Sequence, residues 1–221
     1  MQKPGATAIV GRAAQAAFGV QRGPGKTLLI EDVTLPGAQT DWPALQGPHN
    51  LENARAAIAA ARALGIADDV IAAGLASYRA LAHRMEPIGE KRGLLWINDS
   101  KATNPDSTAP ALTAYPRIHW IAGGRPKLDA KGYADLSAAL PHLGNVVGAY
   151  LIGEAAAQFG EQLADRVPVT PSGTLDQAIA DLLAAAMPGD VVLFSPAAAS
   201  FDQFRDFEQR GAAFRAAVAA L

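Results

Sequence analysis

Hydrophobic and polar positions alternate along this chain in blocks that predict strands followed by helices. From residue 94 onward, short apolar runs end in turn residues and are followed by longer amphipathic segments, a pattern typical of buried parallel strands with crossover helices. Strands are expected near residues 94–98, 118–122, 147–152, 167–170 and 191–194. A long helix from about Phe201 to Ala219 is expected to close the chain. The pattern therefore predicts an α/β fold with a doubly wound, mostly parallel sheet.

The first third of the chain has shorter apolar blocks. Strands are expected at 6–10 and 27–33, with a weaker one at 16–20, and helices are expected over about 50–65 and 68–81. The triplet Gly25-Lys26-Thr27 is similar to the end of a P-loop, but that motif needs a glycine at residue 20, which is Val. Because the triplet also leads into a strand, a P-loop is excluded here, and this region is interpreted as a sheet edge.

Polar side chains follow the apolar run Leu94–Ile97 in residues 99–104, which we call the aspartate loop. Asp99 can accept hydrogen bonds, Lys101 can neutralise a phosphate, and the Thr103 hydroxyl can donate to a carboxylate. In α/β folds, ligands bind at the carboxyl ends of strands, next to helix N-termini. The alternative is an ordinary strand-end loop in which Asn104 or Ser107 caps the following helix.

Two further polar loops follow strands. Residues 123–127 (GGRPK, the glycine loop) contain Lys127, and residues 195–200 (SPAAAS, the serine loop) end in Ser200 at the expected N-terminus of the last helix. A solvated lysine and a simple N-cap serine are the alternatives. Since the carboxyl ends of parallel strands share one edge of a sheet, the three loops are expected to converge into an anion pocket.

Asn50 and Asn53 lie three residues apart at the start of an Ala-rich helix and therefore share one helical face. Two amides at this position could bind a purine or a phosphate-bound water. The alternative is that Asn50 is the N-cap of the helix and Asn53 is merely exposed.

The composition of the chain excludes several kinds of binding site and partner. The chain has 221 residues, of which 50% are hydrophobic, and a formal net charge of −2, so nothing indicates binding to nucleic acid or to an anionic membrane. There is no cysteine, which excludes disulfides and thiolate metal sites. The sequence shows no signal peptide and no apolar run of about 18 residues, so a cytoplasmic location is expected.

Five stretches together resemble the Mur ligase family, in particular its members that add D-glutamate. They are HNLEN at 49–53, HRME at 83–86, INDSKATNPDST at 97–108, GGRPK at 123–127 and SPAAASFDQFRDFEQRG at 195–211. Sister ligases and folylpolyglutamate synthases carry an Asp-x-Ala-His-x-Pro type of loop where this chain has Asp-Ser-Lys-Ala-Thr-Asn. The resemblance runs from about residue 4 to the end of the chain, but it covers only about the last half of those enzymes.

The resemblance implies a fold and a reaction. Residues 1–82 would be the closing part of a central ATP-binding domain, and residues 83–221 a C-terminal Rossmann-like domain that binds the incoming amino acid. The family forms an amide bond at the expense of ATP with Mg²⁺: the L-alanine carboxylate of UDP-N-acetylmuramoyl-L-alanine becomes an acyl phosphate, which the amine of D-glutamate attacks. This reaction belongs to the synthesis of peptidoglycan precursors.

The resemblance also implies residue roles. The positions matching nucleotide contacts are Asn50, Asn53, Arg84, Asp99 and Lys101. The positions matching the D-glutamate site are Thr103 and Lys127 for one carboxylate, and Ser200 with the backbone of Phe207 for the other. No position in this chain matches a metal ligand of the family.

The chain departs from the family pattern because the phosphate loop, the modified lysine, the magnesium ligands and the UDP-sugar domain would all lie upstream of Met1. Activity of the chain alone is therefore not expected. The alternatives are a non-catalytic module that binds an amino acid or a protein partner, or half of a split ligase that needs the N-terminal half in trans. A generic Rossmann-type nucleotide-binding protein is disfavoured because no strand is followed by Gly-x-Gly-x-x-Gly.

Overall fold

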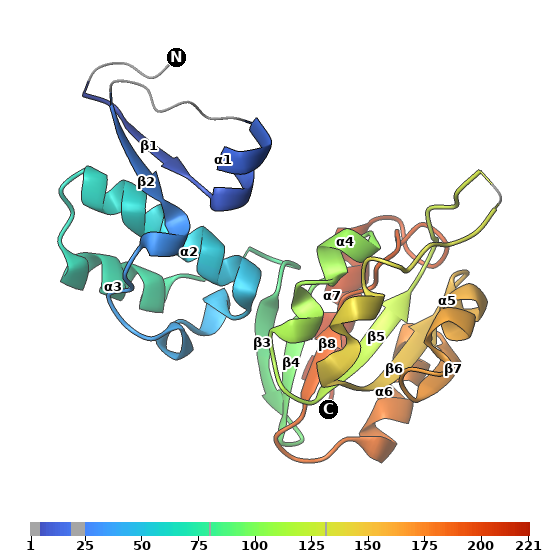
Figure 1. Cartoon of the computed structure of the whole chain (residues 1–221). Helices are drawn as coiled ribbons and strands as arrows, with labels where there is room; N and C mark the ends of the chain where they lie inside the picture. Colours follow the sequence, from blue (N-terminus) through green and yellow to red (C-terminus); the bar gives the residue numbers. More distant parts are fainter. Residues whose placement is uncertain (1–4, 19–24, 80, 131) are drawn as a thin grey trace. The chain divides into compact units, whose positions relative to one another are not determined.

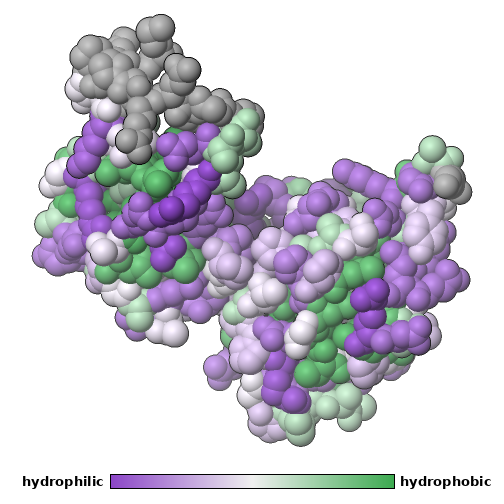
Figure 2. Space-filling model, viewed as in Figure 1, coloured by the Kyte–Doolittle hydropathy of each residue, from purple (hydrophilic) through white to green (hydrophobic). Residues whose placement is uncertain are grey.

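The computed structural model describes residues 5–18, 25–79, 81–130 and 132–221, and these fall into two compact units (Figure 1). The N-terminal unit is Met1–Tyr78 and the C-terminal unit is Arg79–Leu221. The division falls slightly before the boundary expected at residues 82 and 83. Figure 2 shows apolar residues gathered in the middle of the visible face of each unit, with hydrophilic residues around them. Each unit has its own hydrophobic core.

The N-terminal unit combines a small parallel sheet with helices. Its elements are β1 (Thr7–Val10), α1 (Arg12–Phe18), β2 (Lys26–Leu29), the 3₁₀ turns η1 (Ile30–Asp32), η2 (Gln39–Asp41) and η3 (Pro43–Leu45), α2 (Pro48–Ala63) and α3 (Asp68–Ser77). Strands β1 and β2 pair in parallel. The core of this unit is formed by Trp42, Leu45, Ala54, Ile58 and Ile71.

Three expectations for the N-terminal unit need correction. The segment at 16–18 is helical within α1, not a strand, because Arg12–Phe18 is rich in Ala, the strongest helix former; residues 19 and 20 lie outside the described part. The strand expected at 27–33 ends at Leu29, where the chain turns into η1. Helix α3 ends at Ser77, not near residue 81. The triplet Gly25-Lys26-Thr27 does lead into a strand, β2, as predicted.

The C-terminal unit is built on a six-stranded sheet. Its elements are β3 (Glu86–Lys91), β4 (Leu94–Asn98), α4 (Pro105–Thr108), η4 (Ala111–Thr113), β5 (Ile118–Gly123), η5 (Leu140–Asn145), β6 (Val146–Ile152), α5 (Ala156–Leu163), β7 (Val169–Gly173), α6 (Leu175–Ala185), β8 (Val191–Phe194) and α7 (Phe207–Ala219). The strand order is β3-β4-β8-β5-β6-β7, and only the β3–β4 pair is antiparallel. The mostly parallel, doubly wound sheet predicted from the sequence is confirmed, while strand β3 had not been predicted.

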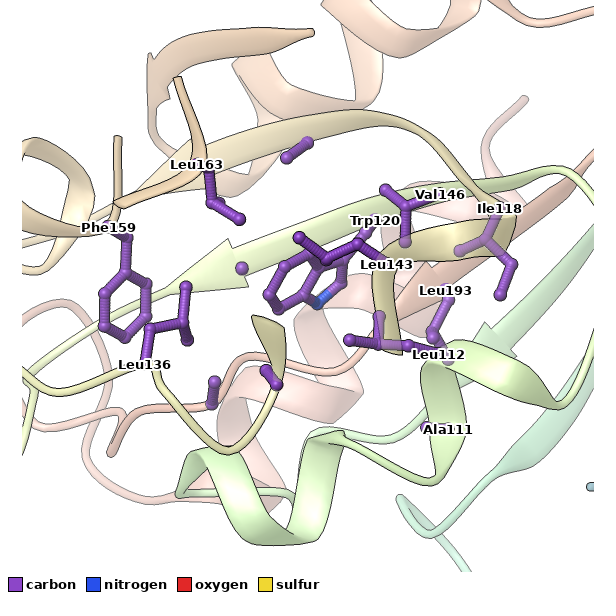
Figure 3. Packing of buried hydrophobic residues seen from close by; sticks show 14 of the residues in the cluster. Ala111, Leu112, Ile118, Trp120, Leu136, Leu143, Val146, Phe159, Leu163 and Leu193 are labelled. Carbon is purple, nitrogen blue, oxygen red and sulfur yellow. The ribbon is translucent and has the colours of Figure 1, made fainter. Parts of the chain in front are cut away.

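Successive residues of a strand point to opposite sides of the sheet, so both faces carry apolar side chains. Both faces are covered by helices or 3₁₀ turns. One face packs against α6 and α7, and its cluster includes Trp96, Phe194 and Phe214. The other face packs against η4, η5 and α5, and there Trp120 lies between Phe159 on one side and Ile118 on the other (Figure 3). Burying each such large apolar side chain contributes roughly 1.5–3 kcal/mol relative to leaving it exposed.

The last helix begins later than predicted. Helix α7 starts at Phe207, and Asp206 caps it by accepting a hydrogen bond from Gln209 N (2.7 Å). Residues 201–206 form turns instead, in which Ser200 O accepts from Phe204 N (2.8 Å). A carboxylate is a strong N-cap, so Asp206 fixes the helix start and removes Ser200 from it.

The segment after the aspartate loop is also less helical than expected. Helix α4 covers only Pro105–Thr108, and Asn104 caps it by accepting from Ser107 N (2.9 Å). The capping role considered for Asn104 is therefore confirmed. Among the described residues, no helix combines the length and the apolar character needed to cross a bilayer.

Candidate functional site

Three neighbouring strands carry the polar loops to one edge of the sheet. Strand β8 lies between β4 and β5, and Phe194 is in register with both Asn98 and Ile121. All three strands run in parallel, so the loops that follow them leave the sheet at the same edge. We call this side the carboxyl edge of the sheet.

The three loops are hydrogen-bonded to one another at this edge. The bonds run from Ala197 N to Ala102 O (3.0 Å), from Gly123 N to Pro196 O (2.7 Å) and from Arg125 N to Ala199 O (2.8 Å). The buried Trp120 holds the serine loop from below, because its Nε1 donates to Ser195 O (2.7 Å). The convergence predicted from the strand order is confirmed, and the loops form one connected structure.

A cavity of about 380 Å³ opens between the aspartate and glycine loops, and both Thr103 and Lys127 line it. Ala197 of the serine loop also lines this cavity, as do the three acidic residues Asp106, Asp129 and Asp135. Lys127 is exposed and Thr103 is half-buried. The volume lies in the usual range for small-molecule pockets. A cation, a hydroxyl and carboxylates in one cavity suit a ligand that carries both carboxylate and ammonium groups.

Ser200 and Phe207 take different positions from those expected. Ser200 is buried, with only 2% of its surface exposed, and it does not line the cavity. The N-terminus of the last helix therefore lies at Phe207, so the expectation that Ser200 stands at the helix N-terminus was wrong. The backbone of Phe207 is tied to the aspartate loop, since its carbonyl accepts from Ser100 Oγ (2.9 Å). Lys101 Nζ lies 5.5 Å from the centre of the Phe207 ring, a cation–π contact.

Asp99 is buried where β4 ends. Ser195 Oγ donates to Asp99 Oδ2 (2.7 Å), and Met85 N donates to Oδ1 (3.0 Å). Burial raises the pKa of Asp99 to about 7, although the bonds from Ser195 and Met85 N and the charge of Arg84 oppose the rise. A substantial share of this carboxyl group is therefore protonated at neutral pH.

The other candidate nucleotide contacts are divided between the two units. Arg84 and Lys101 are exposed in the C-terminal unit, and Asn53 is exposed in the N-terminal unit. Asn50 lies in the first turn of α2, where its side chain donates to Gln46 O (3.0 Å). Gly47 occupies the N-cap position, so the interpretation of Asn50 as the cap of this helix was wrong.

Sequence reasoning missed Arg210, which lies beneath the loops. Its side chain is 1% exposed and donates to Ser100 Oγ (3.1 Å), Ser100 O (2.9 Å) and Ala198 O (3.0 Å). A signal for it was present in the sequence. Arg210 shares one helical face with Phe207, Gly211 and Phe214, so an arginine there had to point into the protein.

A larger cavity, of about 800 Å³, lies in the N-terminal unit along β2 and α2. Its arginine, Arg62, is already bound by Asp68 through two hydrogen bonds (2.7 and 2.9 Å), so its charge is used within the unit. Within the described ranges, no three His, Asp or Glu side chains are grouped so that they could hold a metal ion. The carboxyl edge of the C-terminal sheet is therefore the better candidate site.

Known proteins share this sequence over most of its length. The chain is 56% identical over 191 residues to the UDP-N-acetylmuramoylalanine--D-glutamate ligase of Sphingopyxis alaskensis, an alignment that covers 84% of this chain and 43% of that enzyme. It is 51% identical over 193 residues to the ligase of the same name from Agrobacterium fabrum, covering 86% of this chain and 39% of that enzyme. The chain thus spans less than half the length of these curated relatives.

Solved structures share the fold. A UDP-N-acetylmuramoylalanyl-D-glutamyl-2,6-diaminopimelate--D-alanyl-D-alanyl ligase from Acinetobacter baumannii matches with a TM-score of 0.59 and 18% identity, covering 99% of this chain and 52% of that one. A bifunctional folylpolyglutamate synthase/dihydrofolate synthase from Yersinia pestis, complexed with AMPPNP and a manganese ion, matches with a TM-score of 0.57 and 18% identity, covering 97% and 54%. The family model described as "Mur ligase, glutamate ligase domain" matches residues 83–198, more than half of the chain. The chain belongs to the Mur ligase family.

Proposed function

We propose that this chain is the D-glutamate-binding part of a ligase that joins D-glutamate to UDP-N-acetylmuramoyl-L-alanine. The observation that carries the proposal is the shared cavity of Thr103 and Lys127 at the carboxyl edge. Sequence identities of 50–57% to ligases of this name support the same reaction. The proposal also assigns this chain to the cytoplasm, because the substrates ATP and UDP-sugars are found there.

The cavity supplies what a dicarboxylic amino acid needs. Lys127 neutralises one carboxylate of D-glutamate, and the Thr103 hydroxyl donates to it. The other carboxylate is assigned, through the resemblance, to the backbone of Phe207 at the start of α7 and to Ser200, neither of which lines this cavity. The carboxylates of Asp106 and Asp135 line the same cavity and attract the ammonium group of the ligand.

The role of these residues in the reaction is to bind and to orient. The ammonium group must first lose a proton; the neutral amine then bonds to the carbonyl carbon of the acyl phosphate, and inorganic phosphate leaves. Fixing both carboxylates of D-glutamate restricts the amine to one direction. ATP supplies the phosphoryl group that activates the L-alanine carboxylate. Arg84, Asp99 and Lys101 in the C-terminal unit, and Asn50 and Asn53 in the N-terminal unit, are the proposed nucleotide contacts.

Members of this family also use Mg²⁺ in the reaction. The described residues offer no group of three carboxylates or histidines that could hold this ion. The two units fit the proposed division of labour, in which residues 1–82 close an ATP-binding domain and residues 83–221 form the amino-acid-binding domain.

A ligation assay tests the proposal. The chain is incubated with ATP, Mg²⁺, UDP-N-acetylmuramoyl-L-alanine and radiolabelled D-glutamate, first alone and then with the upstream half of the Sphingopyxis alaskensis ligase as a separate polypeptide. We expect labelled product only in the mixture, and no product when L-glutamate replaces D-glutamate.

The upstream half without this chain is the control, and it should form no product. If the mixture stays inactive while the chain captures another protein and shows no response to either enantiomer of glutamate, the chain is a protein-binding module and the proposal is wrong.

A further inference from the structure

Arg210 connects the loops of the site from below. From the first turn of α7, its guanidinium donates to both the hydroxyl and the carbonyl of Ser100 in the aspartate loop, at 3.1 and 2.9 Å. The same side chain donates to Ala198 O in the serine loop (3.0 Å). Ser100 and Ala198 come from segments about a hundred residues apart, so one buried side chain fixes the spacing of two loops that frame the cavity.

The guanidinium also lies against the glycine loop. A Cβ atom added to Gly124 would lie 3.0 Å from Arg210 Nη1 and 2.3 Å from Ala199 O, and the φ angle of Gly124 is +128°. Only glycine allows this approach without displacing the backbone. All three loops are therefore packed around Arg210.

No carboxylate among the described residues lies within ion-pair distance of Arg210, although the charge of Asp202 acts on it. Its Nη1 is buried without a hydrogen-bond partner, and none of the ion pairs in the described ranges includes it. Burial lowers the pKa of this guanidinium to about 10, with the charge of Asp202 acting in the opposite direction, so the group remains protonated at neutral pH. The ring of Phe194, 5.8 Å away, gives the cation a partial partner.

The helix end does not offset this charge. An arginine in the first turn of a helix adds to the positive end of the helix dipole. Asp206 is in this turn too, but its carboxylate is bound by Gln209 N and by Arg205 Nε at the surface, and Glu208 is exposed. Among the described residues, Asp202 is thus the one carboxylate whose charge acts on Arg210, and the hydrogen bonds of the guanidinium all go to the loops.

We propose that Arg210 is a positioning residue of the D-glutamate site, which holds the three loops at the spacing the ligand requires. This inference rests on the proposed function. Arg210 acts through Ser100, Ala198 and the glycine loop, because the serine-loop residue next to its Ala198 bond, Ala197, lines the cavity and Arg210 itself does not.

The test measures D-glutamate affinity by calorimetry in the full chain and in two variants. R210M removes the charge and the hydrogen bonds while keeping an apolar stem, and R210K keeps the charge but loses the planar fork. We expect affinity to fall by about 10- to 100-fold in R210M, because displaced loops misplace the groups that bind the carboxylates. R210K should recover part of this loss.

R205M is the matched control, since Arg205 is the neighbouring exposed arginine, with 80% of its side chain accessible. R205M removes the same charge as R210M but no contact with the three loops. The D-glutamate affinity of R205M should therefore equal that of the original chain. Circular dichroism establishes that each variant is folded before affinity is compared.

The outcomes separate the two proposals. If the original chain does not bind D-glutamate, the proposed function and this inference both fail. If the original chain binds and folded R210M and R210K bind equally well, only the role of Arg210 is wrong.

If a variant does not fold, a measurement on the unmodified chain still tests the inference. NMR of the arginine Nε–H groups should show the Arg210 signal moving when D-glutamate is added, and no movement with L-glutamate. The signals of Arg62 and Arg117, whose Nε atoms are bound by Asp68 and Asp190 at 2.7 Å, are internal references and should stay in place. An unmoved Arg210 signal at saturating D-glutamate contradicts the inference.

Discussion

The two edges of the sheet in the C-terminal unit both bury charged side chains, but they balance those charges differently. At the amino edge, where β5 and β8 begin, Asp190 is bound by His119 Nε2 (3.0 Å) and by Arg117 Nε (2.7 Å). His119 Nδ1 in turn lies 3.0 Å from the hydroxyl of Tyr150. At the carboxyl edge, Arg210 has carbonyl and hydroxyl partners but no carboxylate within hydrogen-bond distance among the described residues.

The difference distinguishes a structural network from a binding site. Burial alone would raise the pKa of Asp190, but donors from Arg117, Met187 N and His119 outweigh it and lower the pKa to about 2. At the amino edge, the charge of Asp190 is therefore balanced by partners within the protein, so no ligand is needed there. The carboxyl edge combines Arg210, whose buried Nη1 has no hydrogen-bond partner, with a raised pKa at Asp99, and perturbed groups gathered beside a cavity are typical of functional sites.

The largest expected effect is on the amino edge. D190N leaves Arg117 and His119 without their carboxylate and should lower the free energy of unfolding by about 3 kcal/mol, measured by urea denaturation. Because the folded-state pKa of Asp190 is depressed, its contribution is present above about pH 4 and is lost as pH falls toward 2, so this acid-sensitive part should disappear in D190N.

The control for D190N is D165N, an exposed aspartate in the same unit, which should change stability by less than about 0.5 kcal/mol. D-glutamate affinity should be the same in D190N as in the original chain. A loss of affinity in folded D190N would mean that the amino edge also serves the site, and the comparison of the two edges would be wrong.

The glycine loop should be nearly as sensitive. G124A forces a side chain into a left-handed φ of +128° and to within 2.3 Å of Ala199 O, so we expect about 2–3 kcal/mol of destabilisation together with lost D-glutamate affinity. The matched control is G144A, where a Cβ meets nothing within 4 Å. Equal stability of the two variants, measured by thermal denaturation, would contradict the close packing of the loops.

Asp99 should make stability depend on pH in the opposite direction from Asp190. Its folded-state pKa is raised from 3.8 to about 7, so its contribution is present below about pH 4 and is lost as pH rises through 7. D99N should abolish this decline. Urea denaturation between pH 4 and 8 measures it, with the exposed Glu161 changed in E161Q as the control. The same decline in D99N would show that another group causes it.

The smallest expected effect concerns the exposed cation of the cavity. K127M should reduce D-glutamate affinity about tenfold, which corresponds to about 1.4 kcal/mol, while stability stays within about 0.5 kcal/mol because the side chain is exposed. K91M removes an exposed lysine of β3 and should leave affinity unchanged. If K127M and K91M bind D-glutamate equally, Lys127 does not contact the ligand.

The sequence predicted the parallel strands of the C-terminal unit, because buried strands are short runs of apolar residues that are visible in the sequence. It also predicted that their loops converge, because the carboxyl ends of parallel strands share one edge of the sheet. It did not predict the start of α7, since competing capping residues, Ser200 and Asp206, both precede the helix and only the full structure decides between them. Arg210 was missed because its role depends on Ser100 and Ala198, which are distant in sequence. Thr103 and Lys127 were identified from the strand-end loops, the resemblance assigned D-glutamate to them, and the structure places both in one cavity, while their ligand remains part of the proposal.

An NMR titration of the isotope-labelled chain with D-glutamate, with L-glutamate as the control, tests the central claim most directly. We expect D-glutamate alone to shift the amide signals of Thr103, Lys127 and Ser200 at the carboxyl edge, while those of His119 and Asp190 at the amino edge stay in place. A well-dispersed spectrum in which no carboxyl-edge signal moves, or in which both enantiomers act equally, would contradict it.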